Sequence, residues 1–434
     1  MTDSETPRRG RSTAVRAALW TLLALAMLVA LIAAALPLIT YFRQQAADQA
    51  WAASFESMDA LLARFPSVPT NKAAAELAAL ASPVGLSLLP DVVSGATAQT
   101  VSGFLAIGAF LATIESKTDD AALAPPPAEV ASFLSRTTAE FAAIETHLTG
   151  SGPLVWATDL SKGLEGPMPD LEDQPLLARA LLVRALEASR HSDRRAAQQS
   201  LDAFRNLHAG IRDRPELIAQ LISASMGYLH NAVLRQIGSP PDDQVVPVTG
   251  FDWKLAYARS LQAEVARLGT TVRQGRTEGM GVSPTRARLL QSTRNTFLLN
   301  LLLADYSLRM ARLASEIRAE DPCTAAAAAA ASRRLEEAVP WWNPLAKSAM
   351  TGVAQTWRTF GRVALDDELT RLVIQARARV HDVRRSAPPE PAVRSAVCAN
   401  VTWTITTQPN GDVVVEATGA LATDIPRPLF RVRR

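Results

Sequence analysis

Five histidines are the residues of this 434-residue chain best suited to metal binding or acid–base chemistry. None lies in an HExxH pattern or in another spacing typical of metal ligands. Each is therefore expected to be a surface residue or a hydrogen-bonded core residue, and we expect no metal site. They are His147, His191, His208, His230 and His381.

Three pairs of adjacent aspartates are the other candidates for general acid or base work. Adjacent acids in loops or on helix faces are usually solvated, so no catalytic role is expected for them. The sequence contains no G-x-S-x-G, S-x-x-K, Walker A or G-x-G-x-x-G motif, and we predict neither catalytic residues nor a cofactor. The pairs are Asp119–Asp120, Asp242–Asp243 and Asp366–Asp367.

Cys323 and Cys398 are the only cysteines in the chain. In an oxidising compartment an even pair can form a disulfide bridge. Closing a loop of this length would stabilise the fold by about 4 kcal/mol in the chain-entropy model. The alternative is two unrelated buried thiols.

Trp341 and Trp342 stand between two prolines, at the break between two predicted helices. Aromatic pairs of this kind can line a partner groove. The simpler expectation is an aromatic plug that fills the helix break.

Residues 17–42 form the stretch that positions everything else, because they run without a charged side chain. About 20 apolar helical residues are enough to cross a bilayer. Four arginines precede this stretch within the leader 1–16, and positive charge next to such a helix stays in the cytoplasm. We therefore predict a single-pass protein of the bacterial inner membrane, in contact with lipid through residues 17–42, with the bulk of the chain in the periplasm.

Two alternatives to this topology stay open. A cleaved signal peptide is one, because the basic start and Ala33–Ala35 resemble a processing region, although the apolar stretch is longer than usual. A second membrane helix over residues 92–114 is the other, because this segment also lacks charge. Its first half is diluted by small polar residues, so a buried helix is expected.

Alanine-rich composition with only 6% aromatic residues favours helices over strands in the rest of the chain. Single helices are expected over 43–65 and 128–148, and the clearest helical region over 175–237, where three helices follow one another and the first two form a hairpin. There the turn His191–Ser192 is followed by Asp193 as an N-cap. Small residues at the contact points give this hairpin a partly tetratricopeptide-like pattern, but no second copy at the same period follows.

The C-terminal part changes from helical to β patterning. Val401, Trp403 and Ile405 alternate with threonines, and Pro409–Asp412 is typical of a hairpin turn. A single hairpin is marginal alone, so it should dock on the helices. The arginine-rich end is expected to be a solvated tail.

The predicted fold is thus mainly α, with a transmembrane helix, a multi-helix body and a small β-hairpin. Its regions are a cytoplasmic leader 1–16, an anchor 17–42, a membrane-proximal helical region 43–123, a helical-hairpin domain 128–385, a β-hairpin module 392–424 and a basic tail 425–434.

The stretch LLARALLVRALEASRHSDRRAAQQSLDAFRNLHAGIRDRPELIAQLIS, Leu176 to Ser223, resembles a class of uncharacterised bacterial proteins. They have one N-terminal membrane helix and a helix-rich exported body. The closing hairpin also resembles their C-terminal ends and, more distantly, those of major pseudopilins, whose N-terminal processing signal this chain lacks. The resemblance implies an architecture but lends no activity.

Binding is the expected mode of action, as a scaffold or accessory subunit of an envelope complex with a protein partner. Only five of the 45 basic residues are lysines, and no dense basic stripe with interleaved aromatics appears, so no nucleic-acid partner is expected. Two alternatives remain: an enzyme with a site assembled from distant residues, and a secretion- or pilus-related component.

Overall fold

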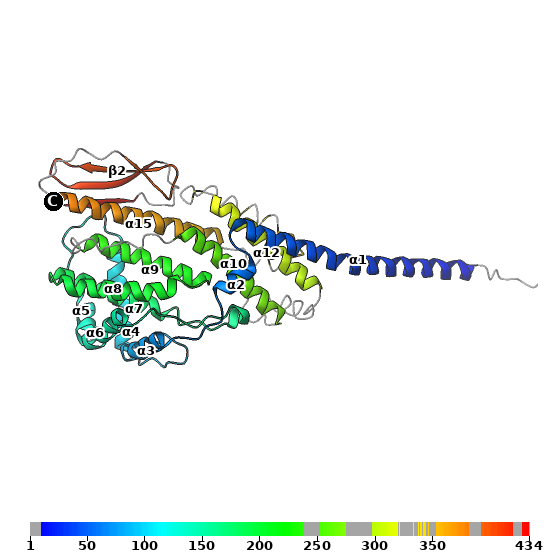
Figure 1. The fold of residues 1–434 in the computed structure, drawn as a ribbon, viewed down its shortest axis with the longest axis horizontal. Helices are drawn as coiled ribbons and strands as arrows, with labels where there is room; N and C mark the ends of the chain where they lie inside the picture. Colours follow the sequence, from blue (N-terminus) through cyan, green and yellow to red (C-terminus); the bar gives the residue numbers. More distant parts are fainter. Residues whose placement is uncertain are drawn as a thin grey trace, which may run out of the picture.

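The computed structural model consists of a long N-terminal helix, a helical body and a small sheet on one side of that body (Figure 1). It describes residues 10–237, 252–274, 297–319, 353–381, 392–419 and 428–433, and single positions between 321 and 346. Both the mainly helical class and the C-terminal β structure expected from the sequence are confirmed.

The first helix, α1 (Gly10–Ser54), contains the whole predicted membrane stretch and then continues into the body. Within the described residues, three helical segments are long and apolar enough to cross a membrane: Ala17–Ser54, Ala98–Glu115 and Leu217–Gln236. The apolar window of the first is 0% buried, whereas those of the other two are 33% and 67% buried. Of these three segments, α1 alone has no buried residue in its apolar window.

The C-terminal half of α1 packs along α12 (Phe297–Ala319), and a buried carboxylate joins the two helices. Asp305 of α12 forms an ion pair with Arg43 of α1 and accepts hydrogen bonds from Arg309 at 2.9 Å and from Asn343 at 2.7 Å. About two helical turns further along α1, the buried indole of Trp51 donates a hydrogen bond to the hydroxyl of Ser307 at 3.1 Å. The apolar N-terminal helix and the body are thus one packed unit.

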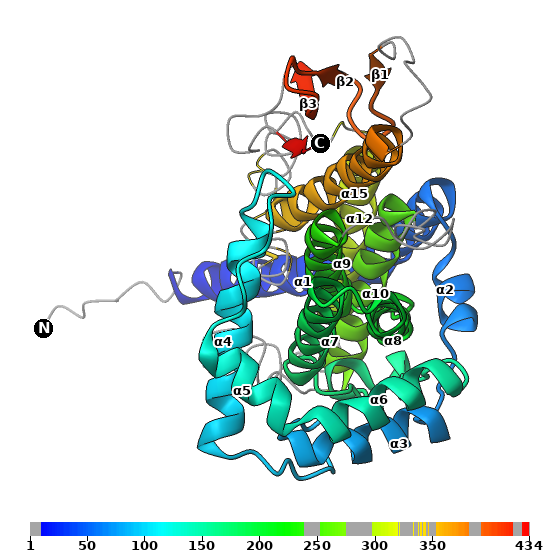
Figure 2. The same cartoon turned by 90° about the vertical axis from the view of Figure 1, so that its left-hand side faces the viewer.

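The body is built in layers around the hairpin α7–α8 and helix α9, with α3, α5 and α6 on the side opposite the sheet (Figure 2). Its elements between α1 and α12 are α2 (Met58–Arg64), α3 (Lys72–Ala81), the 3-10 turn η1 (Ser82–Val84), α4 (Ala98–Glu115), α5 (Ala128–Arg136), α6 (Thr138–Gly150), the 3-10 turn η2 (Leu160–Glu165), α7 (Asp173–Arg190), α8 (Arg194–Arg212), α9 (Leu217–Gln236) and α10 (Trp253–Arg273).

Two helices expected to be continuous are in fact divided. The stretch 43–65 breaks after Ser54, and Ser57 caps the new helix α2 by accepting from the amide of Ala60. The stretch 128–148 breaks at Thr137, whose hydroxyl donates back to the carbonyl of Phe133. The break lets Phe133 pack against both Phe104 and Phe141, with ring centroids 5.0 and 6.2 Å apart, and this packing favours two short helices over one straight helix.

The hairpin predicted over 175–237 is present, and its turn follows the expected chemistry. Ser192 adopts a left-handed φ of 62°, and the Asp193 carboxylate accepts from the amide of Ala196 at 3.0 Å. Tetratricopeptide-like character remains a prediction. The uncharged segment 92–114 contains α4, which begins with a capping box between Thr97 and Thr100 and buries one face against α7 and α9.

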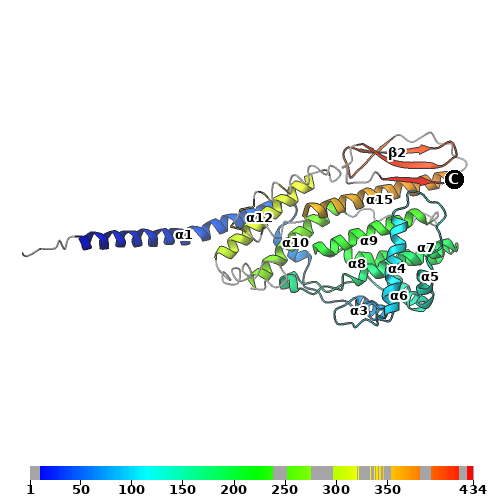
Figure 3. The ribbon, with the colours of Figure 1, turned by 180° about the vertical axis from the view of Figure 1, so that it is seen from behind.

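The C-terminal residues form a four-stranded antiparallel sheet in the order β1-β2-β3-β4, not a lone hairpin. The predicted turn between β2 and β3 is confirmed, with Gly411 at a φ of 89°. The sheet packs on α15 (Val353–His381), at the end of the body far from the N-terminal half of α1 (Figure 3). Its strands are β1 (Val393–Arg394), β2 (Val401–Thr407), β3 (Val413–Gly419) and β4 (Leu429–Val432).

Strand β4 corrects the expectation of a solvated basic tail. Phe430 and Val432 are buried, because β4 pairs with β3 and turns one face toward α15. Arg433, which follows β4, contacts Asp119 before α5 at 2.6 Å. The described residues 428–433 are therefore part of the fold.

We expect Asp305→Asn to unfold the junction between α1 and the body first. The change leaves Arg43 and Arg309 without their carboxylate, and breaking a buried ion pair from one side costs about 3–5 kcal/mol. Urea unfolding of the full chain in detergent micelles measures the loss. The exposed Asp59→Asn is the matched control and should change the free energy of unfolding by less than about 0.5 kcal/mol. Equal stability of the two variants would contradict the role of Asp305.

Candidate functional site

Three consecutive acids on α15 lie at or beside a cavity of about 430 Å³. Successive residues of a helix point about 100° apart, so Asp366, Asp367 and Glu368 face three different neighbours. The expectation that the first two are solvated, like most adjacent acids, was wrong: Asp366 is 7% exposed and the side chain of Asp367 is 16% exposed. Both are covered because α15 lies between α9 and the sheet.

Glu368 holds the C-terminal sheet against α15. Its carboxylate accepts from the hydroxyl of Ser395 at 2.6 Å, from the amides of Ala396 at 2.7 Å and Val397 at 3.2 Å, and from the indole of Trp403 at 2.9 Å. Four donors saturate the acceptor capacity of a carboxylate, and charge-assisted hydrogen bonds are the strong kind. The sheet is thus fixed at one point by a single buried side chain.

Asp366 points to the other side of α15 and pairs with Arg235 of α9. The guanidinium of Arg235 donates to Asp366 and to Thr370, both at 2.7 Å, and lies over the ring of Phe430 in β4. Burial raises the pKa of Asp366, while Arg235 and the amide of Asn231 lower it. This pair ties α9, α15 and the sheet together.

Asp367 is the member of the run that faces a cavity. The cavity has a volume of about 430 Å³ and lies between the ends of α8 and α10, helices α9 and α15, and the loop before β2. Burial raises the pKa of Asp367 to about 6, with Arg371 acting against it and Asp366 and Glu368 acting with it. The apolar walls of the cavity are formed by Ala224, Gly227, Trp253, Phe360, Val363 and Val397.

His208 lines the same cavity as a neutral side chain. Its Nε2 lies 2.9 Å from the carbonyl oxygen and 2.8 Å from the hydroxyl of Ser223, and burial lowers its pKa to about 4. His230 is also buried, with a pKa lowered to about 3, and both rings stack on Phe204. His208 therefore fits the expectation of a hydrogen-bonded core histidine, whereas the buried His230 has no hydrogen-bond partner at its Nδ1 among the described residues.

The remaining candidate histidines are scattered. His147 Nε2 lies 2.8 Å from the carbonyl oxygen of Ala73, and His191 is exposed at the α7–α8 turn, while the side chain of His381 lies outside the described residues. Among the residues that the structure describes, no three His, Cys, Asp or Glu side chains are grouped to hold a metal ion.

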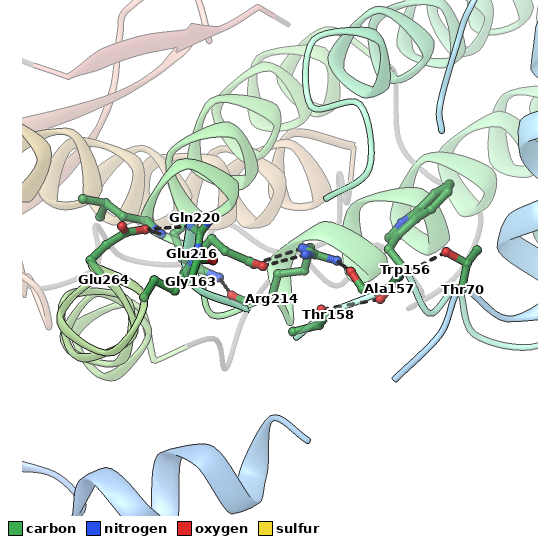
Figure 4. A network of polar contacts seen from close by, with 11 residues as sticks. Thr70, Trp156, Ala157, Thr158, Gly163, Arg214, Glu216, Gln220 and Glu264 are labelled. Atoms are coloured by element: carbon green, nitrogen blue, oxygen red, sulfur yellow. Dashed lines mark hydrogen bonds and ion pairs between the residues drawn. The ribbon is translucent and has the colours of Figure 1, made fainter. Parts of the chain in front are cut away.

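A second polar centre joins the turn between α8 and α9 to the segment before η2 (Figure 4). The buried Arg214 makes a two-point contact with Glu216, at 2.6 and 3.0 Å, and donates to the carbonyls of Trp156 and Ala157. Gln220 donates to the carbonyl of Arg214. The printed hydrogen bonds of Arg214 and Gln220 all go to protein acceptors, so this centre holds loops in place, although the indole nitrogen of Trp156 is buried without a hydrogen-bond partner.

Close backbone approach requires glycine at one point beside this centre. Gly163 has a φ of 67°, and a Cβ there would lie 2.2 Å from the hydroxyl of Thr271. That hydroxyl instead accepts from the amide of Leu164 at 2.7 Å, which joins η2 to α10. A larger cavity of about 590 Å³ lies nearby among loops around Trp156 and Gly210.

Of the residues singled out for binding, the two that the structure describes, Trp342 and Cys398, do not line the cavity beside Asp367. Trp342 is half-buried at the α1 junction, with Arg43 5.7 Å from its ring centroid, and Trp341 lies outside the described residues. Cys398 is fully buried beneath the sheet, and Cys323 also lies outside the described residues, so the bridge stays a prediction. Asp242 and Asp243 lie outside them as well.

The aspartate pair at 119–120 helps to hold the sheet, with side chains that are 28% and 13% exposed. Asp120 accepts from Arg377 of α15 at 3.2 Å and from the amide of Arg433 at 2.7 Å. A hydrogen bond from Arg433 lowers the pKa of Asp119.

Comparison with protein-family models, curated proteins and solved structures found no match for this chain.

We expect Glu368→Gln to loosen the sheet. The amide keeps one acceptor but turns its NH₂ group toward donors, and leaving buried donors unpaired costs about 1–3 kcal/mol each. Hydrogen exchange followed by mass spectrometry should show faster exchange over 393–432 and little change in α7 and α8. The exposed Asp59→Asn in α2 is the control. Unchanged exchange in the sheet would refute this role of Glu368.

The pKa of Asp367 predicts a pH dependence of stability. The folded state raises this pKa from 3.8 to about 6 and so favours the protonated acid. The stabilisation is complete below about pH 4 and is lost as the pH rises through 6. Asp367→Asn should therefore be more stable than the parent chain at pH 7.5, by about 2 kcal/mol after allowance for partial solvation, and nearly equal to it at pH 4. Urea unfolding at both pH values checks this, and a variant that loses stability at pH 7.5 would contradict it.

Proposed function

We propose that this chain is a single-pass inner-membrane protein whose body lies in the periplasm and acts by binding, as a scaffold or accessory subunit of an envelope complex. The cavity beside Asp367 is the binding site in this proposal. The observation that carries it is the combination of an apolar helix packed into the body with a cavity of small-molecule size between α9, α10, α15 and the loop before β2.

The dimensions of α1 support a membrane-spanning role. Trp20 and Tyr41 are both largely exposed and lie about 32 Å apart at 1.5 Å per helical residue. A bilayer has an apolar core of about 30 Å, and aromatic residues gather at its two borders. The exposed apolar side chains between them, including Leu38 and Ile39, would face water if the helix were not embedded in lipid.

The join between α1 and α12 supports retention of the helix over its removal as a signal peptide. Half-buried Leu36 and Thr40 lie just after the predicted processing region, and Arg43 and Trp51 follow with buried partners. Processing after Ala35 would leave Leu38, Tyr41 and Phe42 as exposed apolar side chains on a water-facing helix. Such a patch favours aggregation or association in water.

Binding is favoured over catalysis by the state of the polar groups that line the cavity. Glu368 is saturated by donors from the sheet, and His208 is neutral with its Nε2 directed at Ser223. An enzyme with a site assembled from distant residues is the second candidate. The observation that favours it is the pKa of Asp367 near 6, which suits a general acid or base close to neutral pH.

Topology reporters fused after Leu80 and after Arg434 test the proposal. Both should report the periplasmic side, because α4 buries one face in the body and does not return the chain across the membrane.

In that compartment Cys323 and Cys398 should be oxidised, and the full chain should migrate faster without reductant than with it, whereas Cys398→Ser should not. A cytoplasmic signal from the second reporter, or a soluble mature product, would overturn the proposed topology.

A further inference from the structure

The cavity beside Asp367 has one aromatic side and one polar side. The aromatic side comes from Trp253 of α10 and Phe360 of α15, and Trp253 is held in place against Trp357, with ring centroids 4.8 Å apart. The cavity volume of about 430 Å³ is at the lower end of the range for small-molecule sites. The aromatic side suits a ligand with a short apolar body.

The polar side presents a buried acceptor that lacks a donor. Asn231 lines the cavity and is 2% exposed, and its Oδ1 has no hydrogen-bond partner among the described residues. Its amide interacts with the carboxyl of Asp366, which as a carboxylate can only accept, so the NH₂ group faces Asp366 and the oxygen is left over. An unpaired buried acceptor costs about 1–3 kcal/mol, which a ligand donor would recover.

Asp367 supplies a second acceptor on the same cavity, and it carries charge. Its nearest cation is Arg371, one helical turn along α15, with the guanidinium 3.6 Å from the carboxylate and the Arg371 side chain 43% exposed. This is a loose contact beyond hydrogen-bond distance. The carboxylate of Asp367 is thus available to a better-placed cation.

The other charged side chains of the lining already have partners. Asp252 caps α10 through the amide of Leu255, and Glu368 holds the sheet. Arg212 donates to Asp213 at 3.0 Å, and the ammonium of Lys254 lies 5.7 Å from the ring centroid of Trp253. Asn231 and Asp367 therefore each present an oxygen to the cavity that no donor of the lining reaches within hydrogen-bond distance.

We propose that this cavity binds a small organic cation, a primary amine or a guanidinium on a short apolar body. The cationic group donates to Oδ1 of Asn231 and to the carboxylate of Asp367, and the apolar body packs on Trp253 and Phe360. Arg371 then acts as an internal competitor for Asp367. The inference rests on the proposed function, since it names the ligand class for the same cavity.

The test measures binding of benzylamine, agmatine, benzyl alcohol and benzoate to the full chain in detergent micelles, by calorimetry and by tryptophan fluorescence. The two cations should bind at least tenfold more tightly than the neutral alcohol, with benzoate weakest. Asp367→Asn should weaken cation binding tenfold or more, whereas Arg371→Gln should strengthen it. The exposed Asp59→Asn is the control and should bind as the parent chain does.

The outcomes separate this inference from the proposed function. Tighter binding of benzoate, weakened by Arg371→Gln, would overturn the ligand class and leave the cavity as a binding site. Binding of none of the four probes at millimolar concentration would overturn both the ligand class and the role of the cavity, while the topology would stand on its own reporters. Asn231→Leu serves as a further variant: it removes the acceptor at nearly the same size, so cation binding should weaken, and unchanged binding would overturn the assigned contact.

Discussion

The buried carboxylate of Glu368 is a central contact that fixes the C-terminal sheet on α15. It accepts four hydrogen bonds, three of them from the loop before β2 and one from the buried Trp403. The sheet in turn closes one side of the Asp367 cavity through Ala396 and Val397 and covers Arg235 with Phe430. The geometry of both neighbouring acids therefore depends on this contact, since without the sheet Asp366 and Asp367 would be open to water.

Local chemistry made much of the fold predictable. The charge-free run 17–42, the cap at Asp193 and the turn at Gly411 act within a few residues, and all are found in α1, the α7–α8 hairpin and the β2–β3 turn. The break at Thr137 was missed because it depends on a distant contact. Phe133 packs directly on Gly103 of α4, where a Cβ would lie 2.3 Å from the ring, and periodicity along the sequence carries no trace of that.

The candidate site was less predictable, because its residues gain their properties from what covers them. Adjacent acids are normally solvated, and nothing near Asp366–Asp367 in the sequence indicates that α9 and a sheet from the end of the chain will cover them. The sequence contained one weak signal. Asp366, Asp367 and Glu368 stand between Leu365 and Leu369, which are one helical turn apart and are both buried. Three successive acids flanked by core leucines place at least one carboxylate beside the core.

The continuous course of α1 from the predicted membrane stretch into the body has a mechanical consequence for the proposed topology. A flexible tether would let the body sample many heights and tilts, whereas a helix held by Arg43 and Trp51 moves with the body as one rigid unit. In a single-pass protein of the proposed kind, the face that carries the sheet would be held at a fixed distance from the lipid surface. A partner would then have to reach that face at this height, and a lateral force on the sheet would tilt the helix in the membrane.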